Sequence, residues 1–276
     1  MELTSREYKL MLRTDRFSGA ESDCRKAVAS FWQAAGGHLQ KAGVETAGKL
    51  EHAAPDKQRR IVFLDTADKA LFRQAGLVCR LRRRLDAEEP WTETLKFRHG
   101  DRLLSGAQAF RLREKKKKKG KFEEDVKAAG SADAPAFRAL FSRSVDARLE
   151  QREEVATIGD LLQPFSGLSR LPLPSDDAAV VEVGALRIVE HVYEGGALRL
   201  PADVEAESAM IVWWREGEAQ SPVAAEFSFR FALEKGAVEV DVAERAWRAL
   251  SVLHGSDWAV PDGTTKTALV YGGGGG

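Results

Sequence analysis

LVCRLRRRLD, residues 77–86, places three arginines at every other position of one short run. Arg80, Arg82 and Arg84 share one parity, while Leu77, Cys79 and Leu81 share the other. This alternation with a period of two predicts a strand that has one apolar face and one basic face. The apolar face has to pack against other elements, so the arginines point either to solvent or into a polar interior.

The composition limits the possible fold and function only broadly. The chain has 276 residues, 43% of them hydrophobic and 30% charged, which allows a sizeable core in one large domain or in two subdomains. Its 42 Lys and Arg balance 42 Asp and Glu, so the overall charge does not support a nucleic-acid partner. The composition carries no sign of an oligomeric state.

Several features predict a cytoplasmic protein with no membrane partner. Cys24 and Cys79 are the two cysteines, and they lack the spacing of a metal site. The N-terminus has no apolar signal-peptide region, and no apolar stretch reaches membrane-spanning length. We expect residues 1–271 to form a single domain and the glycine run at 272–276 to be a flexible tail.

Strand-like alternation recurs along the chain, with helical patterns in between. Strands are expected near residues 4–13, 59–66, 77–86, 91–100, 185–195, 208–217 and 224–236. Helices are expected near 21–36, 65–76, 132–144, 157–165 and 241–255, and a last extended piece near 264–272. Without regular strand–helix alternation, this order favours an α+β fold, an antiparallel sheet or barrel with attached helices.

Other strands repeat the division into an apolar and a charged face. Phe227 and Phe229 oppose Glu226 and Ser228, for example. For any single strand, exposure to solvent explains the charged face. Rows of Arg and Lys on several strands also fit a closed barrel whose charged faces point inward, and eight strands enclose roughly one small ligand. A multiply charged phosphate chain suits such an interior, because arginine binds phosphate oxygens bidentately.

Several segments, in the same order, resemble the CYTH family, also called the triphosphate tunnel metalloenzymes. SREYK (residues 5–9) resembles the opening ExExK strand of that family, and FLDTADKALFRQAGLVCRLRRR (63–84) resembles its central block. TLK (94–96), KFEED (121–125), EFS (226–228) and TK (265–266) resemble its later short motifs. The resemblance implies an eight-stranded antiparallel tunnel that binds triphosphates and holds Mg²⁺ or Mn²⁺.

The resemblance also implies roles for individual side chains. The expected phosphate-binding residues are Lys9, Arg60, Arg80, Arg82, Arg84, Lys96, Lys121 and Lys266. The expected metal ligands are Glu7, Glu123, Asp125 and Glu226, and Glu7, Glu123 and Glu226 are expected to be catalytic. The implied activity is that of a Mg²⁺- or Mn²⁺-dependent triphosphatase, a hydrolase of inorganic triphosphate or a related compound.

Two departures from the motifs keep alternatives open. Ser5 and Ser228 stand where the family pattern has glutamate, and fewer carboxylates weaken binding of a divalent metal. The first alternative is a non-catalytic or weakly active module that binds polyphosphate or a nucleotide. The second is an ordinary β-rich protein with an exposed charged face.

Overall fold

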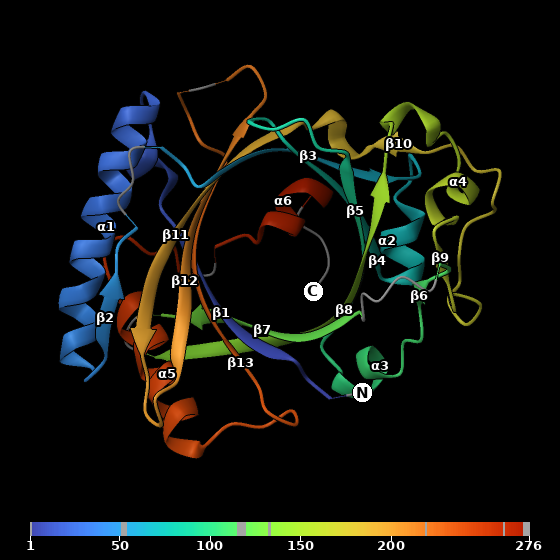
Figure 1. The fold of residues 1–276 in the computed structure, drawn as a ribbon. Helices are drawn as coiled ribbons and strands as arrows, with labels where there is room; N and C mark the ends of the chain where they lie inside the picture. The colour runs from blue at the N-terminus through green and yellow to red at the C-terminus, as the bar shows by residue number, and fades with distance from the viewer. Residues whose placement is uncertain are drawn as a thin grey trace.

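Eleven strands hydrogen-bond side by side in one sheet of the computed structural model, which describes residues 2–50, 54–114, 120–131, 134–218, 220–261 and 263–272 (Figure 1). A pairing between β3 and β11 closes nine of these strands into a ring. In order around the ring they are β3 (Lys57–Asp65), β4 (Leu77–Arg84), β5 (Trp91–His99), β8 (Pro135–Leu149), β7 (Lys121–Gly130), β1 (Ser5–Leu12), β13 (Ala224–Ala232), β12 (Glu205–Arg215) and β11 (Ile188–Arg199).

The predicted α+β fold, a mainly antiparallel β-tunnel with flanking helices, is confirmed. It is also the architecture that the resemblance to the CYTH family implies. The ring has nine strands where eight were expected, and its β1–β7 pairing is parallel. The ninth strand is β8, which the sequence had indicated as a helix.

The remaining elements flank the ring. The short strands are β2 (Glu45–Gly48), β6 (Arg111–Leu112), β9 (Phe165–Ser166) and β10 (Val181–Glu182). The α-helices are α1 (Glu21–Lys41), α2 (Ala70–Ala75), α3 (Arg102–Gly106), α4 (Ile158–Leu162), α5 (Val240–His254) and α6 (Lys266–Tyr271). Three 3-10 turns complete the described part, η1 (Thr14–Phe17), η2 (Arg152–Glu154) and η3 (Val183–Ala185).

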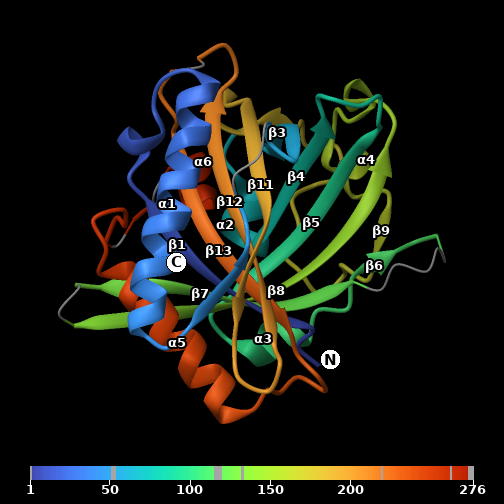
Figure 2. The same cartoon turned by 60° about the vertical axis from the view of Figure 1, so that its left-hand side comes forward.

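Helices cover the outer face of the ring. α1 buries Val28, Phe31 and Ala35 at helical spacing, and the Phe31 ring lies 5.0 Å from that of Phe227 on β13. Figure 2 shows α1 lying along the outside of the sheet, with α5 beneath it. On the opposite side, α2 and α4 pack against the apolar face of β3, β4 and β5. Apolar side chains of β3, β4, β5 and β13 therefore face outward, against the helices.

Two of the predicted elements are wrong in type. Residues 132–144, expected to be a helix, belong mostly to β8, which pairs with both β5 and β7. Their Ala, Leu and Arg favour a helix, but pairing on both edges outweighs that weak preference. Residues 264–272, expected to be extended, contain α6, whose first turn is capped by the Thr265 hydroxyl accepting from the Ala268 amide at 3.1 Å.

An apolar floor fills the ring at the level of α6. Its members come from β1, β3, β11, β12, β13, η3 and α6, and they include Met11, Ile61, Phe63, Ile188, Trp213, Val270 and Tyr271. Tyr271 stacks on Phe72 with 4.2 Å between the ring centroids. Figure 1 shows α6 inside the ring of strands. The ring interior is therefore apolar on this side of the charged side chains.

No helix among the described residues is long and apolar enough to cross a membrane. The expected single domain over residues 1–271 stays a prediction. Most of the expected tail, residues 273–276, lies outside the described residues.

Candidate functional site

Above the apolar floor, charged side chains from seven ring strands and from α6 form a polar layer inside the ring. We define the polar layer as Glu7, Lys9, Arg59, Arg80, Arg82, Lys96, Arg98, Asp125, Glu190, Glu226 and Lys266. They have the parity opposite to the outward apolar residues of their strands. The side chains of Lys9, Lys96 and Arg98 are 20–23% exposed, so solvent reaches this layer.

The arginine wall consists of Arg59 on β3 with Arg80 and Arg82 on β4. Arg59 pairs with Glu190 at 2.5 Å, and the Trp213 indole N–H donates to the same carboxylate at 2.7 Å. Among the described residues, neither Arg80 nor Arg82 forms an ion pair, and the Nε of each has no hydrogen-bond partner. Arg82 donates only a long bond of 3.5 Å to the Thr94 hydroxyl. Arg80 and Arg82 therefore have N–H donors available to a ligand.

The pKa values of Arg80 and Arg82 are both lowered, chiefly by burial. Burial, and then the neighbouring Arg82, lower the pKa of Arg80 to about 9. Burial, and then Arg59, lower the pKa of Arg82. Both guanidinium groups stay charged at neutral pH, and an anion would relieve their repulsion.

The Asp125 cluster lies on β5, which adjoins β4, and on β7 and β1. The Asp125 carboxylate meets Lys9 at 2.9 Å, Arg98 at 2.8 Å and Lys96 at 3.5 Å. Burial opposes its ionisation, but Lys9, Lys96 and Arg98 outweigh burial and hold the pKa of Asp125 well below its ordinary value. Burial lowers the pKa of Lys96 to about 8, although Asp125 opposes this. Lys9 also meets Glu7 at 3.1 Å.

Lys266 reaches the polar layer from the first residue of α6. Its ammonium meets Glu226 at 2.8 Å and lies 5.4 Å from the centre of the Trp213 ring. The next residue, Thr267, accepts a bond of 3.4 Å from Arg98. α6 thus closes the floor and also presents a cation to the layer above it.

The predicted metal ligands do not assemble into a metal site. Glu7 and Asp125 are paired with lysine and arginine, Glu226 is paired with Lys266, and Glu123 accepts from the Ser5 hydroxyl at 3.3 Å. Across the described residues, no three His, Cys, Asp or Glu side chains form a group that could hold a metal ion. Because ammonium and guanidinium groups pair with Glu7, Asp125 and Glu226, these carboxylates in this arrangement do not fit Mg²⁺ or Mn²⁺.

The structure brings together five of the eight predicted phosphate-binding residues, Lys9, Arg80, Arg82, Lys96 and Lys266. The other three lie elsewhere. Arg60 has outward parity, and its Nε bonds Glu216 at 2.8 Å. Arg84 ends β4 and pairs with Asp86, and Lys121 is exposed at the start of β7.

Three polar-layer residues were missing from the sequence prediction. Arg98 shares the parity of Lys96 in residues 91–100, a signal that was present. Arg59 and Arg60 are adjacent, and the following IVFLD is apolar at both parities, so the sequence did not say which arginine faces inward. Glu190 is 3% exposed, and no motif in the sequence distinguished it from Glu194 in the same strand.

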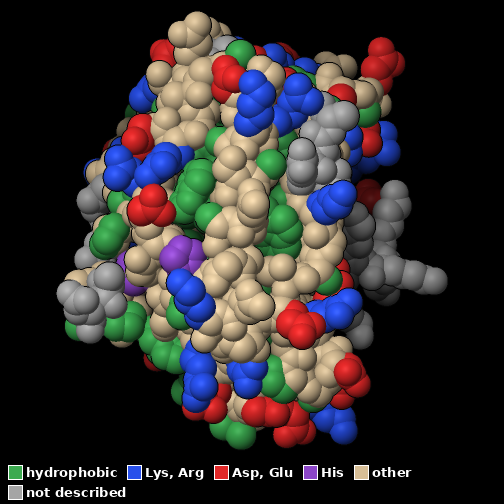
Figure 3. Space-filling model, turned by 90° about the vertical axis from the view of Figure 1, so that its left-hand side faces the viewer, with side chains coloured by type: hydrophobic (Ala, Val, Ile, Leu, Met, Phe, Trp, Pro, Cys, Tyr) green, Lys and Arg blue, Asp and Glu red, His purple; other side chains and the backbone are tan. Residues whose placement is uncertain are grey.

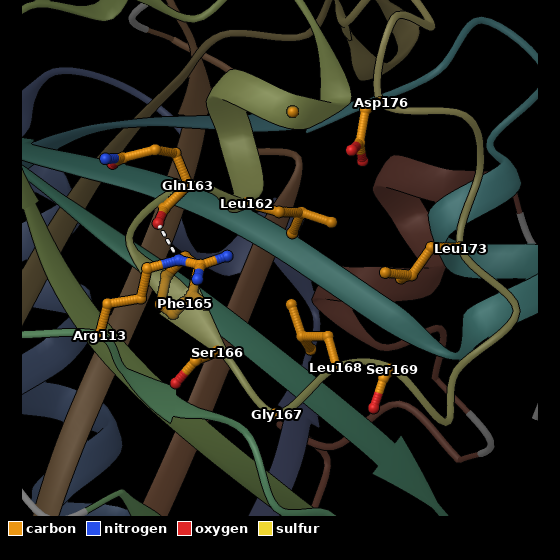
Figure 4. Close-up of a pocket in the computed structure, with 11 residues that line it drawn as sticks. Arg113, Leu162, Gln163, Phe165, Ser166, Gly167, Leu168, Ser169, Leu173 and Asp176 are labelled. Atoms are coloured by element: carbon orange, nitrogen blue, oxygen red, sulfur yellow. Dashed lines mark hydrogen bonds between the residues drawn. The ribbon is translucent and has the colours of Figure 1, made fainter.

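Two surfaces outside the ring, both within the described residues, differ in character from the polar layer. The face formed by α1 carries basic and acidic side chains interspersed (Figure 3). A pocket outside the ring, next to α4 and β9, is lined by residues that include Arg113, Gln163, Phe165 and Asp176 (Figure 4). In it the Arg113 Nε donates to the Gln163 carbonyl oxygen at 2.8 Å. None of the residues predicted from the sequence lines this pocket.

Comparison with known proteins gives distant structural likenesses. No family model and no curated protein match the chain. Among solved structures, the chain is similar to a candidate adenylyl cyclase, HpAC1 from Hippeastrum, described as having a dominant triphosphatase activity, with 15% identity, a TM-score of 0.46, and coverage of 98% of this chain and 96% of that one. It is also similar to a candidate adenylate cyclase from Vibrio parahaemolyticus, with 9% identity, a TM-score of 0.31, and coverage of 92% and 89%. Both TM-scores lie below 0.5.

Proposed function

We propose that the protein binds the triphosphate group of inorganic triphosphate, or of a related compound, in the polar layer inside its ring. The observation that carries this proposal is the pair of inward arginines, Arg80 and Arg82, without an ion-pair partner among the described residues. Buried charges without partners are costly, and arginine matches phosphate oxygens with paired N–H donors. A polyanion supplies the missing counter-charge.

The layer can hold more than one phosphate group. Arg80 and Arg82 come from β4, Lys96 and Arg98 from β5, Lys9 from β1 and Lys266 from α6. A chain of phosphates can contact cations on several of these elements at once, and each contact adds to its binding free energy. Orthophosphate can contact only a few of them.

Calorimetric titration with tripolyphosphate in the presence of a chelator tests the proposal. We expect saturable binding that weakens steeply as salt is raised, because the contacts are ionic. A flat titration at low salt would contradict the proposed function.

Metal-dependent hydrolysis of the bound triphosphate is the second candidate function. The observation that favours it is that Glu7, Glu123, Asp125 and Glu226 lie on the inner face of three adjoining strands, β7, β1 and β13. The present pairing of Glu7, Asp125 and Glu226 with cations argues for binding alone.

Phosphate release decides between binding and hydrolysis. A hydrolase would release orthophosphate from tripolyphosphate with Mg²⁺ or Mn²⁺, release none with a chelator, and lose this activity in Glu226→Gln. Binding without release under any of these conditions would leave the protein as a polyphosphate-binding module.

We also propose the cytoplasm as its compartment, with a small polyphosphate ligand and neither nucleic acid nor membrane as a partner. Cys24 and Cys79 are both buried and free, which agrees with a reducing environment.

A further inference from the structure

Asp125 occupies the position in its cluster that an anionic ligand would take. One oxygen faces Lys9 at 2.9 Å, and the other faces Arg98 at 2.8 Å and Lys96 at 3.5 Å. The Asp125 side chain is 7% exposed, and it belongs to β7 in the middle of the sheet. Three cations are thus neutralised largely by a carboxylate of the protein itself, with Glu7 adding a contact to Lys9.

The arginine wall differs in this respect. Arg80 and Arg82 form no ion pair among the described residues, and Glu190 pairs with Arg59 alone. An incoming anion therefore finds free donors on the wall, while at the Asp125 cluster it has to compete with a tethered carboxylate. A tethered group competes at a high effective concentration, which a small free anion does not match.

The two places are close enough for one ligand. Arg80 lies directly opposite Thr94 on β5, and Lys96 is two residues further along on the same face. Such diagonal neighbours have Cα atoms about 7–8 Å apart. A phosphate chain held by the wall can therefore extend to Lys96 and the cations beside it.

We infer that Asp125 is a selectivity residue, because its carboxylate competes with small anions for Lys9, Lys96 and Arg98. Only a polyphosphate that also binds Arg80 and Arg82 displaces it. This inference rests on the proposed function, because it assumes binding in the polar layer. Once the arginine wall binds one end of a polyphosphate, the other end is tethered too. It then competes with Asp125 at a high effective concentration. Orthophosphate lacks that second anchor.

Removal of the Asp125 charge tests the inference. In the presence of a chelator, the affinities of orthophosphate and tripolyphosphate are measured for the wild type and for Asp125→Asn. We expect the affinity for orthophosphate to rise about tenfold and that for tripolyphosphate to rise less, so that the preference for the longer chain shrinks. If Asp125 instead only holds the cations in place, both affinities fall and the preference is kept, which would overturn the inference.

Glu124→Gln is the matched control. Glu124 is the preceding residue of β7, has outward parity and pairs with Arg6 at 3.3 Å. It undergoes the same change of charge away from the polar layer, so the ratio of the two affinities should equal that of the wild type.

A measurement on the wild type keeps the inference testable if Asp125→Asn does not fold. We expect the side-chain carboxyl ¹³C resonance of Asp125 to shift on saturation with tripolyphosphate and to stay unchanged with orthophosphate. An unchanged resonance with bound tripolyphosphate overturns the inference and leaves the proposed function intact. Absence of tripolyphosphate binding to the wild type overturns both.

Discussion

Glu93 is a carboxyl group buried on the outer face of β5, away from the polar layer. It is 1% exposed, and its nearest polar partner is the Cys79 thiol, whose Sγ lies 3.5 Å from Oε1. Burial raises the pKa of Glu93 from 4.5 to about 8, although Cys79 opposes this. The folded protein therefore keeps this group protonated at pH values where the unfolded chain has lost the proton.

The raised pKa predicts how stability depends on pH. Stability from protonated Glu93 is fully present below pH 4.5 and is lost as pH rises toward about 8. Between pH 4.5 and about 8, loss of this stabilisation lowers the free energy of unfolding by up to about 1.4 kcal/mol per pH unit. Glu93→Gln should flatten the profile measured by urea denaturation. Glu88→Gln, at an exposed carboxyl in the β4–β5 turn, should keep the wild-type slope, and an equal slope in Glu93→Gln would contradict the account of Glu93.

Single positions also mark how far the sequence could predict the site. The parity of Arg80, Arg82 and Lys96 followed from strands whose other face is apolar, and the structure places all three inside the ring. Arg59 and Arg60 could not be distinguished, because β3 is apolar on both faces beyond them. The pairing of carboxylates with cations depends on contacts between β1, β5, β7, β13 and α6, which no local pattern contains.

At the scale of elements, α6 combines two roles. Val270 and Tyr271 pack in the apolar floor, while Lys266 at its first residue meets Glu226 in the polar layer. The sequence signal for a helix was weak because the segment is only six residues long. Its helical state depends on the Thr265 cap and on burial inside the ring.

Loss of the Tyr271 ring should therefore destabilise the whole protein. Tyr271 is 5% exposed and packs against Phe63 and Phe72. We expect Tyr271→Ala to lower the free energy of unfolding by about 3 kcal/mol, as measured by urea denaturation. Val240→Ala, at a side chain that is 82% exposed, should change it by less than about 0.5 kcal/mol. Equal stability of the two variants would show that α6 is not part of the core.

At the scale of the whole molecule, the ring explains how a chain with no net charge can concentrate cations. The 42 basic and 42 acidic residues balance overall, yet the inward parity of β4 and β5 carries arginine and lysine without an equal number of acids. The closing pair β3–β11 and the parallel pair β1–β7 join segments that are far apart in sequence. Period-two patterns predicted the strands, but the order of strands around the ring depends on these long-range pairings.

The central claim is that Arg80 and Arg82 bind the phosphate chain from inside the ring. The most direct test compares tripolyphosphate affinity by calorimetry in the wild type, in the double variant Arg80→Met with Arg82→Met, and in Arg83→Met. Arg83 lies between them on β4 with the opposite parity, 4.8 Å from the centre of the Trp91 ring, and serves as the matched control. We predict a loss of about tenfold or more for each inward arginine and near wild-type affinity for Arg83→Met. Equal affinity in all three proteins would contradict the claim.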